Sequence, residues 1–171
     1  MAIFDILKEQ RRLRMLQDLS LVQHKKCLKN LDDIQTVGII VHNLTDEEQF
    51  TMLQFEQLMT RRGIPIEKIE LGADEESYLD NEGIPKAEFL HNFINKHYDI
   101  LIDTTINNDF FGLYVSLRSK TSLRVAYADA NQKLSPIALA TYDLFVQGSG
   151  PRQLVPFLTG LLTILSQIRK N

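Results

Sequence analysis

Short apolar, β-branched runs alternate along this chain with segments whose apolar residues follow a helical period. The clearest of these runs are residues 36–41 and residues 98–103. An unbroken apolar run is typical of a strand that is covered on both faces, as strands are in parallel sheets. Because strand and helix patterns alternate, the sequence predicts an α/β fold with a mainly parallel sheet and helices on both faces.

Three further runs complete a predicted five-stranded sheet, at residues 66–71, 123–127 and 142–146. Helices are predicted between them and after the last one, at about residues 46–62, 86–97, 109–119 and 151–169. Right-handed crossovers then favour a single doubly wound, Rossmann-like domain. Two segments are expected to be irregular: the acidic residues 72–85, as a surface loop with at most a turn of helix, and residues 128–141, as a crossover without a helix.

Helix boundaries are signalled by particular side chains. Thr45 and Glu48 have the spacing of a capping box, so a helix should begin at this point. Asp109 and the two preceding asparagines offer capping oxygens for another helix. Pro151 follows a glycine-rich turn and suits the first turn of the last helix.

The first thirty residues differ from the rest of the chain. They carry seven Lys or Arg and three acids, and they contain neither Gly nor Pro. Their apolar residues recur at spacings of three and four, which predicts an amphipathic helical arm over residues 1–30, ahead of an α/β domain over residues 31–171. The arm is expected to dock on its own domain or on a second copy. Contact of residues 1–20 with an anionic membrane, or contact with nucleic acid, is the alternative.

Composition excludes several classes of protein. A single cysteine, Cys27, rules out a disulfide framework and a cysteine-rich zinc site. A net charge of −3 argues against a surface that coats nucleic acid. No export signal is recognisable, and residues 154–168 form a stretch that is too short to span a bilayer. These features favour a cytoplasmic protein.

Polar side chains are expected to gather where the carboxyl ends of the strands meet. In a doubly wound sheet the ligand crevice lies outside these ends, where the strand order reverses. The candidate ligand-binding residues stand at the ends of the first, third and fifth predicted strands, namely His42, Asn43, Asp103, Thr104, Thr105, Gly148, Ser149 and Gly150. Their donors would suit an anionic small molecule such as a nucleotide or a sugar phosphate.

Each candidate also has a purely structural interpretation. Asp103 could lie beside a phosphate or bind a metal, or it could cap backbone N–H groups in a turn. His42 could act as an acid or base, or it could be a hydrogen-bonded loop residue. The turn formed by Gly148, Ser149 and Gly150 could cradle an anion, or it could simply start a helix.

Motifs that would decide between these interpretations are missing from the sequence. Neither the P-loop pattern nor the dinucleotide-binding glycine pattern occurs, and no pair of histidines has the spacing of a metal-binding helix. No serine, cysteine or aspartate is spaced to form a triad with His42. The sequence therefore assigns no catalytic residue, no metal ligand and no identifiable cofactor, and whether the chain is an enzyme stays open.

The basic leader, the strand at residues 37–41 and the Tyr98-Asp99-Ile100-Leu101-Ile102-Asp103 element together resemble a family of small bacterial proteins of unknown function, known chiefly from the Bacteroidetes. The resemblance covers nearly the whole chain and implies no activity. The tyrosine-aspartate-strand-aspartate element is also similar to strands in the N-terminal, Rossmann-like half of heptosyltransferase-like glycosyltransferases. The chain lacks the second, nucleotide-sugar-binding half of those enzymes, so transferase activity is not expected.

Two functions of different class follow from these features. The first is a non-catalytic module that acts through self-association or a protein partner, because the chain has an arm and a very apolar last helix. A two-fold dimer through the last helix, the arm or both is expected, since a helix that is apolar nearly all round should be buried nearly all round. The second is a protein that binds an anionic small molecule in the strand-end crevice.

Overall fold

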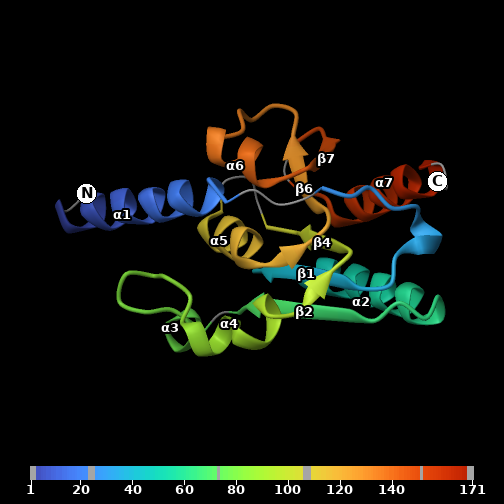
Figure 1. Cartoon of the computed structure of the whole chain (residues 1–171), viewed down its shortest axis with the longest axis horizontal. Coiled ribbons are helices and arrows are strands. Elements are labelled where there is room, and N and C mark those ends of the chain that lie inside the picture. The colour runs from blue at the N-terminus through green and yellow to red at the C-terminus, as the bar shows by residue number, and fades with distance from the viewer. Residues whose placement is uncertain (1–2, 23–25, 73, 106–108, 151, 169–171) are drawn as a thin grey trace.

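The computed structural model describes residues 3–22, 26–72, 74–105, 109–150 and 152–168 (Figure 1). Its first half contains α1 (Ile3–Ser20), the 3₁₀ turn η1 (Leu31–Asp33), β1 (Val37–His42), α2 (Asp46–Arg61), β2 (Ile66–Leu71), α3 (Glu75–Tyr78) and α4 (Ala87–Ile94). Its second half contains β3 (His97–Tyr98), β4 (Ile100–Asp103), α5 (Phe110–Arg118), β5 (Lys120–Thr121), β6 (Arg124–Asp129), α6 (Pro136–Thr141), β7 (Leu144–Gly148) and α7 (Leu154–Gln167).

Five parallel strands form the central sheet in the order β2-β1-β4-β6-β7. The predicted α/β fold, with its doubly wound sheet and helices on both faces, is therefore confirmed. The apolar runs at residues 36–41 and 98–103 supply β1 and β4, which lie inside the sheet as expected. The short strands β3 and β5 pair separately, also in parallel, so Tyr98 belongs to this small pair and not to the main sheet.

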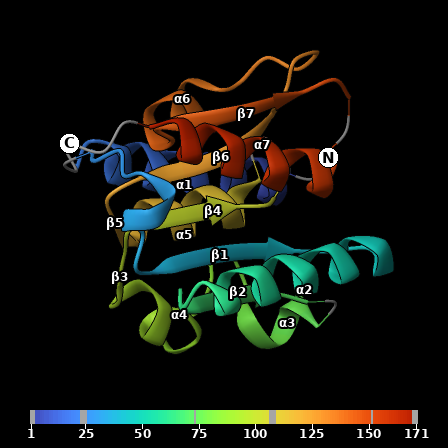
Figure 2. The same cartoon turned by 90° about the vertical axis from the view of Figure 1, so that its right-hand side faces the viewer.

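The alternation of side chains along β1 explains why both faces of the sheet are covered. Val37, Ile39 and Val41 point into one core, which α2 and α7 complete. Ile40 points into the second core, which α4, α5 and α6 cover. Figure 2 shows α2 and α7 in front of the sheet, with α5 and α1 behind it.

The last helix is covered mainly by its own chain. Leu154, Phe157, Leu158, Leu161 and Leu165 of α7 are buried, and Leu162 and Ile164 are partly buried against the same core. Val155 is the large apolar side chain of α7 that stays exposed. Most of the apolar surface that suggested a dimer through this helix is thus buried against the sheet and α2.

The arm docks on the domain through its middle and its C-terminal part, and its N-terminal end stays exposed. Leu16 is buried against the core beneath α5 and α6, whereas Phe4 and Leu7 are exposed. Residues after the arm return along the sheet, where the Cys27 N–H donates to the Ser122 carbonyl. The helical part of the predicted arm is α1.

Three local expectations need correction. Residues 128–141 do contain a helix, because the Ser135 hydroxyl accepts the Ala138 N–H and Pro136 occupies the first turn of α6. The fifth strand runs on to Gly148, which pairs with Asp129 instead of lying in a turn. The last helix starts at Leu154, and Pro151 lies outside the described residues.

The other local signals are confirmed where the structure describes them. The capping box of α2 is complete, with Thr45 and Glu48 each accepting a backbone N–H from the other. Asp109 caps α5 through the Gly112 N–H, while the two asparagines before it lie outside the described residues. The acidic segment contains only the short helix α3. Among the described helices, none is long and apolar enough to cross a membrane.

Candidate functional site

The strand order reverses between β1 and β4. These strands are neighbours in the sheet, and β2 and β6 continue the sheet on their outer sides. The crevice expected from the sequence therefore lies outside the ends of β1 and β4. His42 is the last residue of β1 and Asp103 is the last residue of β4.

His42 is held between two carboxylates from different helices. Its Nδ1 lies 3.1 Å from Oδ2 of Asp109, and its Nε2 lies 3.1 Å from Oε1 of Glu75. Its ring also makes an edge contact with the ring of Phe111. The hydrogen bond that His42 donates to Asp109 is the largest influence and raises its pKa; burial opposes this rise and Glu75 adds to it, giving a pKa of about 9. The imidazole is therefore protonated at neutral pH and cannot accept a further proton as a base.

Asp103 is enclosed by groups that donate to it. Its carboxylate accepts the Tyr142 hydroxyl, and its Oδ1 accepts the Thr105 N–H at 2.8 Å. Burial raises the pKa of Asp103 to about 6, although the bonds from Tyr142 and Thr105 oppose this rise. Gly112 of α5 completes the enclosure, because a Cβ at this position would overlap Asp103 and Thr105. Asp103 is 1% exposed, and its carboxylate bonds to groups of the fold itself.

Thr104 joins β4 to β1. Its backbone N–H and its hydroxyl both donate to the Ile40 carbonyl, at 3.0 and 2.7 Å. The Thr104 carbonyl in turn accepts a hydrogen bond from the Arg152 guanidinium. The polar atoms at the end of β4 are thus tied to β1 on one side and to the segment before α7 on the other.

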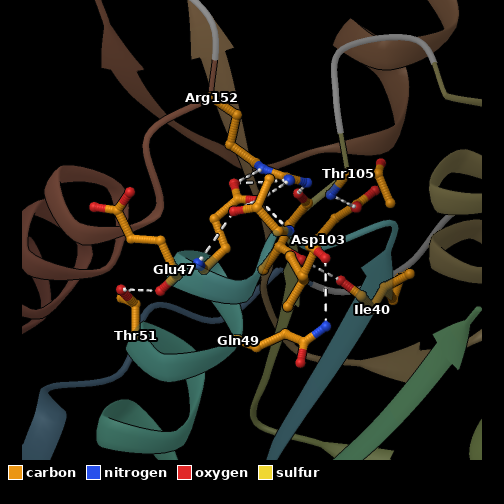
Figure 3. A network of polar contacts seen from close by, with 11 residues as sticks. Ile40, Glu47, Gln49, Thr51, Asp103, Thr105 and Arg152 are labelled. Atoms are coloured by element: carbon orange, nitrogen blue, oxygen red, sulfur yellow. Dashed lines mark hydrogen bonds and ion pairs between the residues drawn. The ribbon is translucent and has the colours of Figure 1, made fainter.

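Arg152 and Glu48 form an ion pair across this edge of the sheet, within the network of polar contacts that Figure 3 shows around Arg152. The Arg152 Nε donates to Oε1 of Glu48 and its Nη2 donates to Oε2, both at 2.8 Å. The side chains are 9% and 15% exposed. Glu48 also accepts the Thr45 N–H, so one carboxylate caps α2 and neutralises the arginine. This pair fills the position beside the N-terminus of α2 where an anionic ligand would otherwise be stabilised.

The glycine turn after β7 is occupied by an internal carboxylate. Asp129, at the end of β6, accepts the Gly150 N–H at 3.1 Å and the Asn131 N–H at 2.9 Å. The Tyr127 hydroxyl donates to the Gly150 carbonyl at 2.9 Å. The Gly150 N–H, which was expected to help bind an external anion, therefore already donates to Asp129.

The structure brings some of the predicted site residues together and leaves others apart. Asp103, Thr104 and Thr105 are buried and linked to β1 or α5, and His42 contacts the α5 cap. Asn43 is exposed and adopts a left-handed conformation with φ of 51°. Ser149 is exposed as well. The structure therefore shows a tightly bonded cluster, with these two residues facing outward.

Sequence reasoning missed the residues that fill the crevice. Glu48 was recognised only as a cap, and the partners of His42 were not identified because Glu75 and Asp109 belong to distant elements. Arg152 had a usable signal, since it is the sole charged residue between positions 144 and 168. An isolated charge in so apolar a stretch indicates a specific partner.

Within the described ranges, no group of three or more His, Cys, Asp or Glu side chains is placed to hold a metal ion. A groove of about 560 Å³ lies between the N-termini of α2 and α7. Its lining includes Glu47, Glu48 and Arg152 together with apolar side chains at the start of α7. Because Glu47 and Glu48 face this groove, it does not favour an anion.

Comparison with known proteins gives a family and a distant structural likeness. Residues 10–147 match a family described as "Family of unknown function (DUF6913)". No curated protein matches the chain. Among solved structures, a response regulator receiver domain (CheY-like) from Methylobacillus flagellatus is 19% identical, with a TM-score of 0.42 over 77% of this chain and 98% of that one. The resemblance to a family without known function is confirmed, while the Bacteroidetes origin and the glycosyltransferase likeness stay predictions.

Proposed function

Since this chain belongs to DUF6913, a family of unknown function, we propose from its own geometry that it is an interaction module, which acts by binding another protein surface without catalysis. The observation that carries this proposal is the occupation of the strand-end crevice by the chain's own side chains. In α/β folds this crevice is the usual ligand site. Here its principal donors are bonded to Glu48 and Asp129.

An external anion would have to displace these internal carboxylates. Glu48 is held by both the α2 cap and Arg152, so its removal would leave a largely buried guanidinium without its main partner. Such a loss is costly, because a buried charge needs compensation. This cost disfavours the alternative function, in which a nucleotide or sugar phosphate binds near Gly148 and Gly150.

The surface offers a more suitable place for binding. Phe4 is 77% exposed and Leu7 is 55% exposed, both on the part of α1 that projects from the domain. Apolar side chains on a projecting helix favour association with a protein surface, because association removes them from water. The free, exposed thiol of Cys27 is consistent with a reducing compartment, so we place this activity in the cytoplasm.

A ligand screen tests the proposal. The melting temperature of the full chain would be measured with ATP, GTP, UDP-glucose, glucose 6-phosphate and inorganic phosphate. A true ligand present at 100 times its Kd would stabilise the fold by about 2.7 kcal/mol. We expect no such stabilisation from any of the five.

A matched variant makes the screen decisive. If one of the compounds raised the melting temperature in a saturable way, and Arg152→Met abolished the shift, the crevice would be a ligand site and the proposal would be overturned. Glu47→Gln is the control, because Glu47 lies beside the pair in the same groove. A shift that neither variant changed would place the ligand elsewhere, and would equally contradict a module that works without a small molecule.

A further inference from the structure

The arm is fixed at its middle and projects at its N-terminal end. The Arg12 Nε donates to the Glu82 carbonyl at 2.8 Å, and its guanidinium lies 5.1 Å from the centre of the Phe110 ring. Arg11 forms an ion pair with the Glu82 carboxylate. Among the described side chains of α1, Leu16 alone is buried, and the N-terminal end of the helix projects from the domain (Figure 1).

A groove of about 550 Å³ runs beside this helix. Its floor is apolar and its rim carries both signs of charge; the lining residues are Leu13, Leu16, Phe110, Leu113, Ser135 and Ile137 together with Asp5, Lys8, Glu9 and Arg12. One wall is α1 itself, and the others are α5 and the start of α6. Such a lining suits an amphipathic helix that carries mixed charges.

Charge is distributed unevenly along α1. Residues 3–10 carry two acids, Asp5 and Glu9, with one lysine, whereas residues 11–20 carry three arginines and one acid. Two copies packed in parallel would place like charges side by side. An antiparallel arrangement would instead lay the acidic half of each helix beside the basic half of the other, which is favourable.

We propose that two copies of this chain associate through an antiparallel, two-fold contact between their α1 helices, each occupying the groove of the other. The inference rests on the proposed function, for which it names the partner and the surface. Ile6 and Leu13 are two helical turns apart and lie on nearly the same face. When the helices cross near Glu9, Ile6 of each copy comes level with Leu13 of the other, at the edge of the groove.

The same crossing accounts for the exposed tip of the arm. An antiparallel partner carries its first turn towards the other copy's α5 and α6, so Phe4 gains an apolar surface to cover it. A two-fold contact of this kind is self-complementary and closes at two copies. A membrane is a poorer occupant, because Asp5 and Glu9 lie in the projecting turns and Phe4 is their only aromatic residue.

Sedimentation equilibrium of the full chain over roughly 1–100 µM, concentrations that resolve a Kd in the micromolar range, tests the contact. We expect the mass to rise from 19.7 kDa towards twice that value. Leu13→Asp should raise the dimer Kd by on the order of tenfold or more. Phe50→Asp, on the exposed face of α2, is the matched control and should leave the Kd unchanged. Circular dichroism melts of each variant establish that the fold is retained.

A charge exchange tests the direction of the helices. Asp5→Arg should weaken the dimer severalfold, and adding Arg14→Glu to the same chain should restore most of the affinity, because positions 5 and 14 lie opposite each other when the antiparallel helices cross near Glu9. A monomer at every concentration would overturn the inference, as would a dimer that responds to Phe50→Asp and not to Leu13→Asp. Failure of Arg14→Glu to restore affinity would exclude the antiparallel contact.

These results are separable from those of the ligand screen. If the chain is monomeric and no phosphate compound stabilises it, the dimer contact is overturned but the proposed function, with an occupied crevice, stands. If the chain is a dimer and also binds a nucleotide in the crevice, the dimer contact stands and the proposed function is overturned. Cosedimentation with phosphatidylglycerol vesicles that Leu13→Asp abolishes, in a monomeric chain, would assign the arm to a lipid surface and overturn the inference.

Discussion

Arg152 and Glu48, which are 104 residues apart in the sequence, meet in a two-point ion pair at the carboxyl edge of the sheet. The pair joins the N-terminus of α2 to the segment before α7, so it links the two helices that cover one face. Because Glu48 also belongs to the α2 capping box, the same carboxylate supports a local and a long-range structure.

Breaking this pair should be strongly destabilising. We expect Arg152→Met and Glu48→Gln each to lower the free energy of unfolding by about 2–4 kcal/mol, because each leaves a largely buried polar partner uncompensated. The double variant should lose less than the sum of the two single losses, since the second change removes the stranded partner. Urea unfolding measures all four proteins. Strict additivity would show that the two side chains do not interact, and Glu47→Gln should change stability by no more than about 0.5 kcal/mol.

The pH dependence of stability should contain a contribution from His42. Its pKa in the folded protein is about 9, above the ordinary value of 6.5. The protonated ring therefore stabilises the fold fully below about pH 6.5, and this stabilisation is lost as the pH rises through about 9. The raised pKa corresponds to at most about 3 kcal/mol.

Urea unfolding of the wild type and of His42→Gln at about pH 5.5, 7.5 and 9.5 measures this contribution, since these values bracket the titration. The wild type should be more stable than His42→Gln at the two lower pH values, and this difference in stability should shrink at the highest pH. His91→Gln is the control, because His91 is exposed on α4. An advantage that grew between pH 7.5 and 9.5 would contradict a raised pKa.

Gly112 is required by close packing and not by its backbone angles. A Cβ at this position would overlap the Thr105 hydroxyl and the Asp103 carboxylate. We expect Gly112→Ala to lower stability by about 1–3 kcal/mol, the usual cost of overpacking a filled site. Gly72→Ala provides the comparison, because nothing lies within 4 Å of a Cβ built there. Equal thermal stability of the two variants would contradict this expectation, because it would show that the groups around Asp103 can move to accommodate a methyl group.

Asp99 should make the fold sensitive to acid. It accepts the Gln35 N–H at 2.7 Å and pairs with Lys29 at 2.5 Å. Burial alone would raise its pKa, but the bonds from Lys29, Gln35 and Thr36 together lower it below 3.8. The stability that the charged form provides is therefore present above about pH 4 and is lost as the pH falls through the lowered pKa.

The measurement for Asp99 compares acid unfolding of the wild type with that of Asp99→Asn. The wild type should be more stable near neutral pH, and the difference should diminish below about pH 4, when the carboxylate takes up a proton. Asp33→Asn is the control, because Asp33 is an exposed aspartate two residues before Gln35, which bonds to Asp99. A constant difference between the wild type and Asp99→Asn down to the lowest pH would exclude a role for the charge.

Strand and helix patterns predicted this fold well because burial on two faces leaves a direct trace in the sequence. Val37, Ile39 and Val41 serve one core and Ile40 serves the other, so the whole run has to be apolar. The error at α6 has a local origin. Residues 128–141 were expected to lack a helix because they contain a proline, whereas Pro136 directly after the Ser135 cap is well placed to start one.

The contents of the strand-end crevice were less predictable. The position of His42 at a strand end follows from the pattern, but its two partners are 33 and 67 residues away. The link between Arg152 and Glu48 likewise depends on how α2 and α7 meet in three dimensions. Spacing along the chain carries information about caps and periodicity, and it carries little about such tertiary pairs.

The parallel sheet also has a consequence for the order in which the chain folds. No hairpin can start the sheet, because every neighbouring pair of strands is parallel. The shortest loop to close joins Val125 to Leu144, and the longest joins Val37 to Ile100. Since longer loops cost more entropy to close, the β4-β6-β7 half should assemble before β1 docks on it. Until then β4 keeps an open edge, and in a crowded refolding mixture the β1 of another copy could take that place by strand exchange.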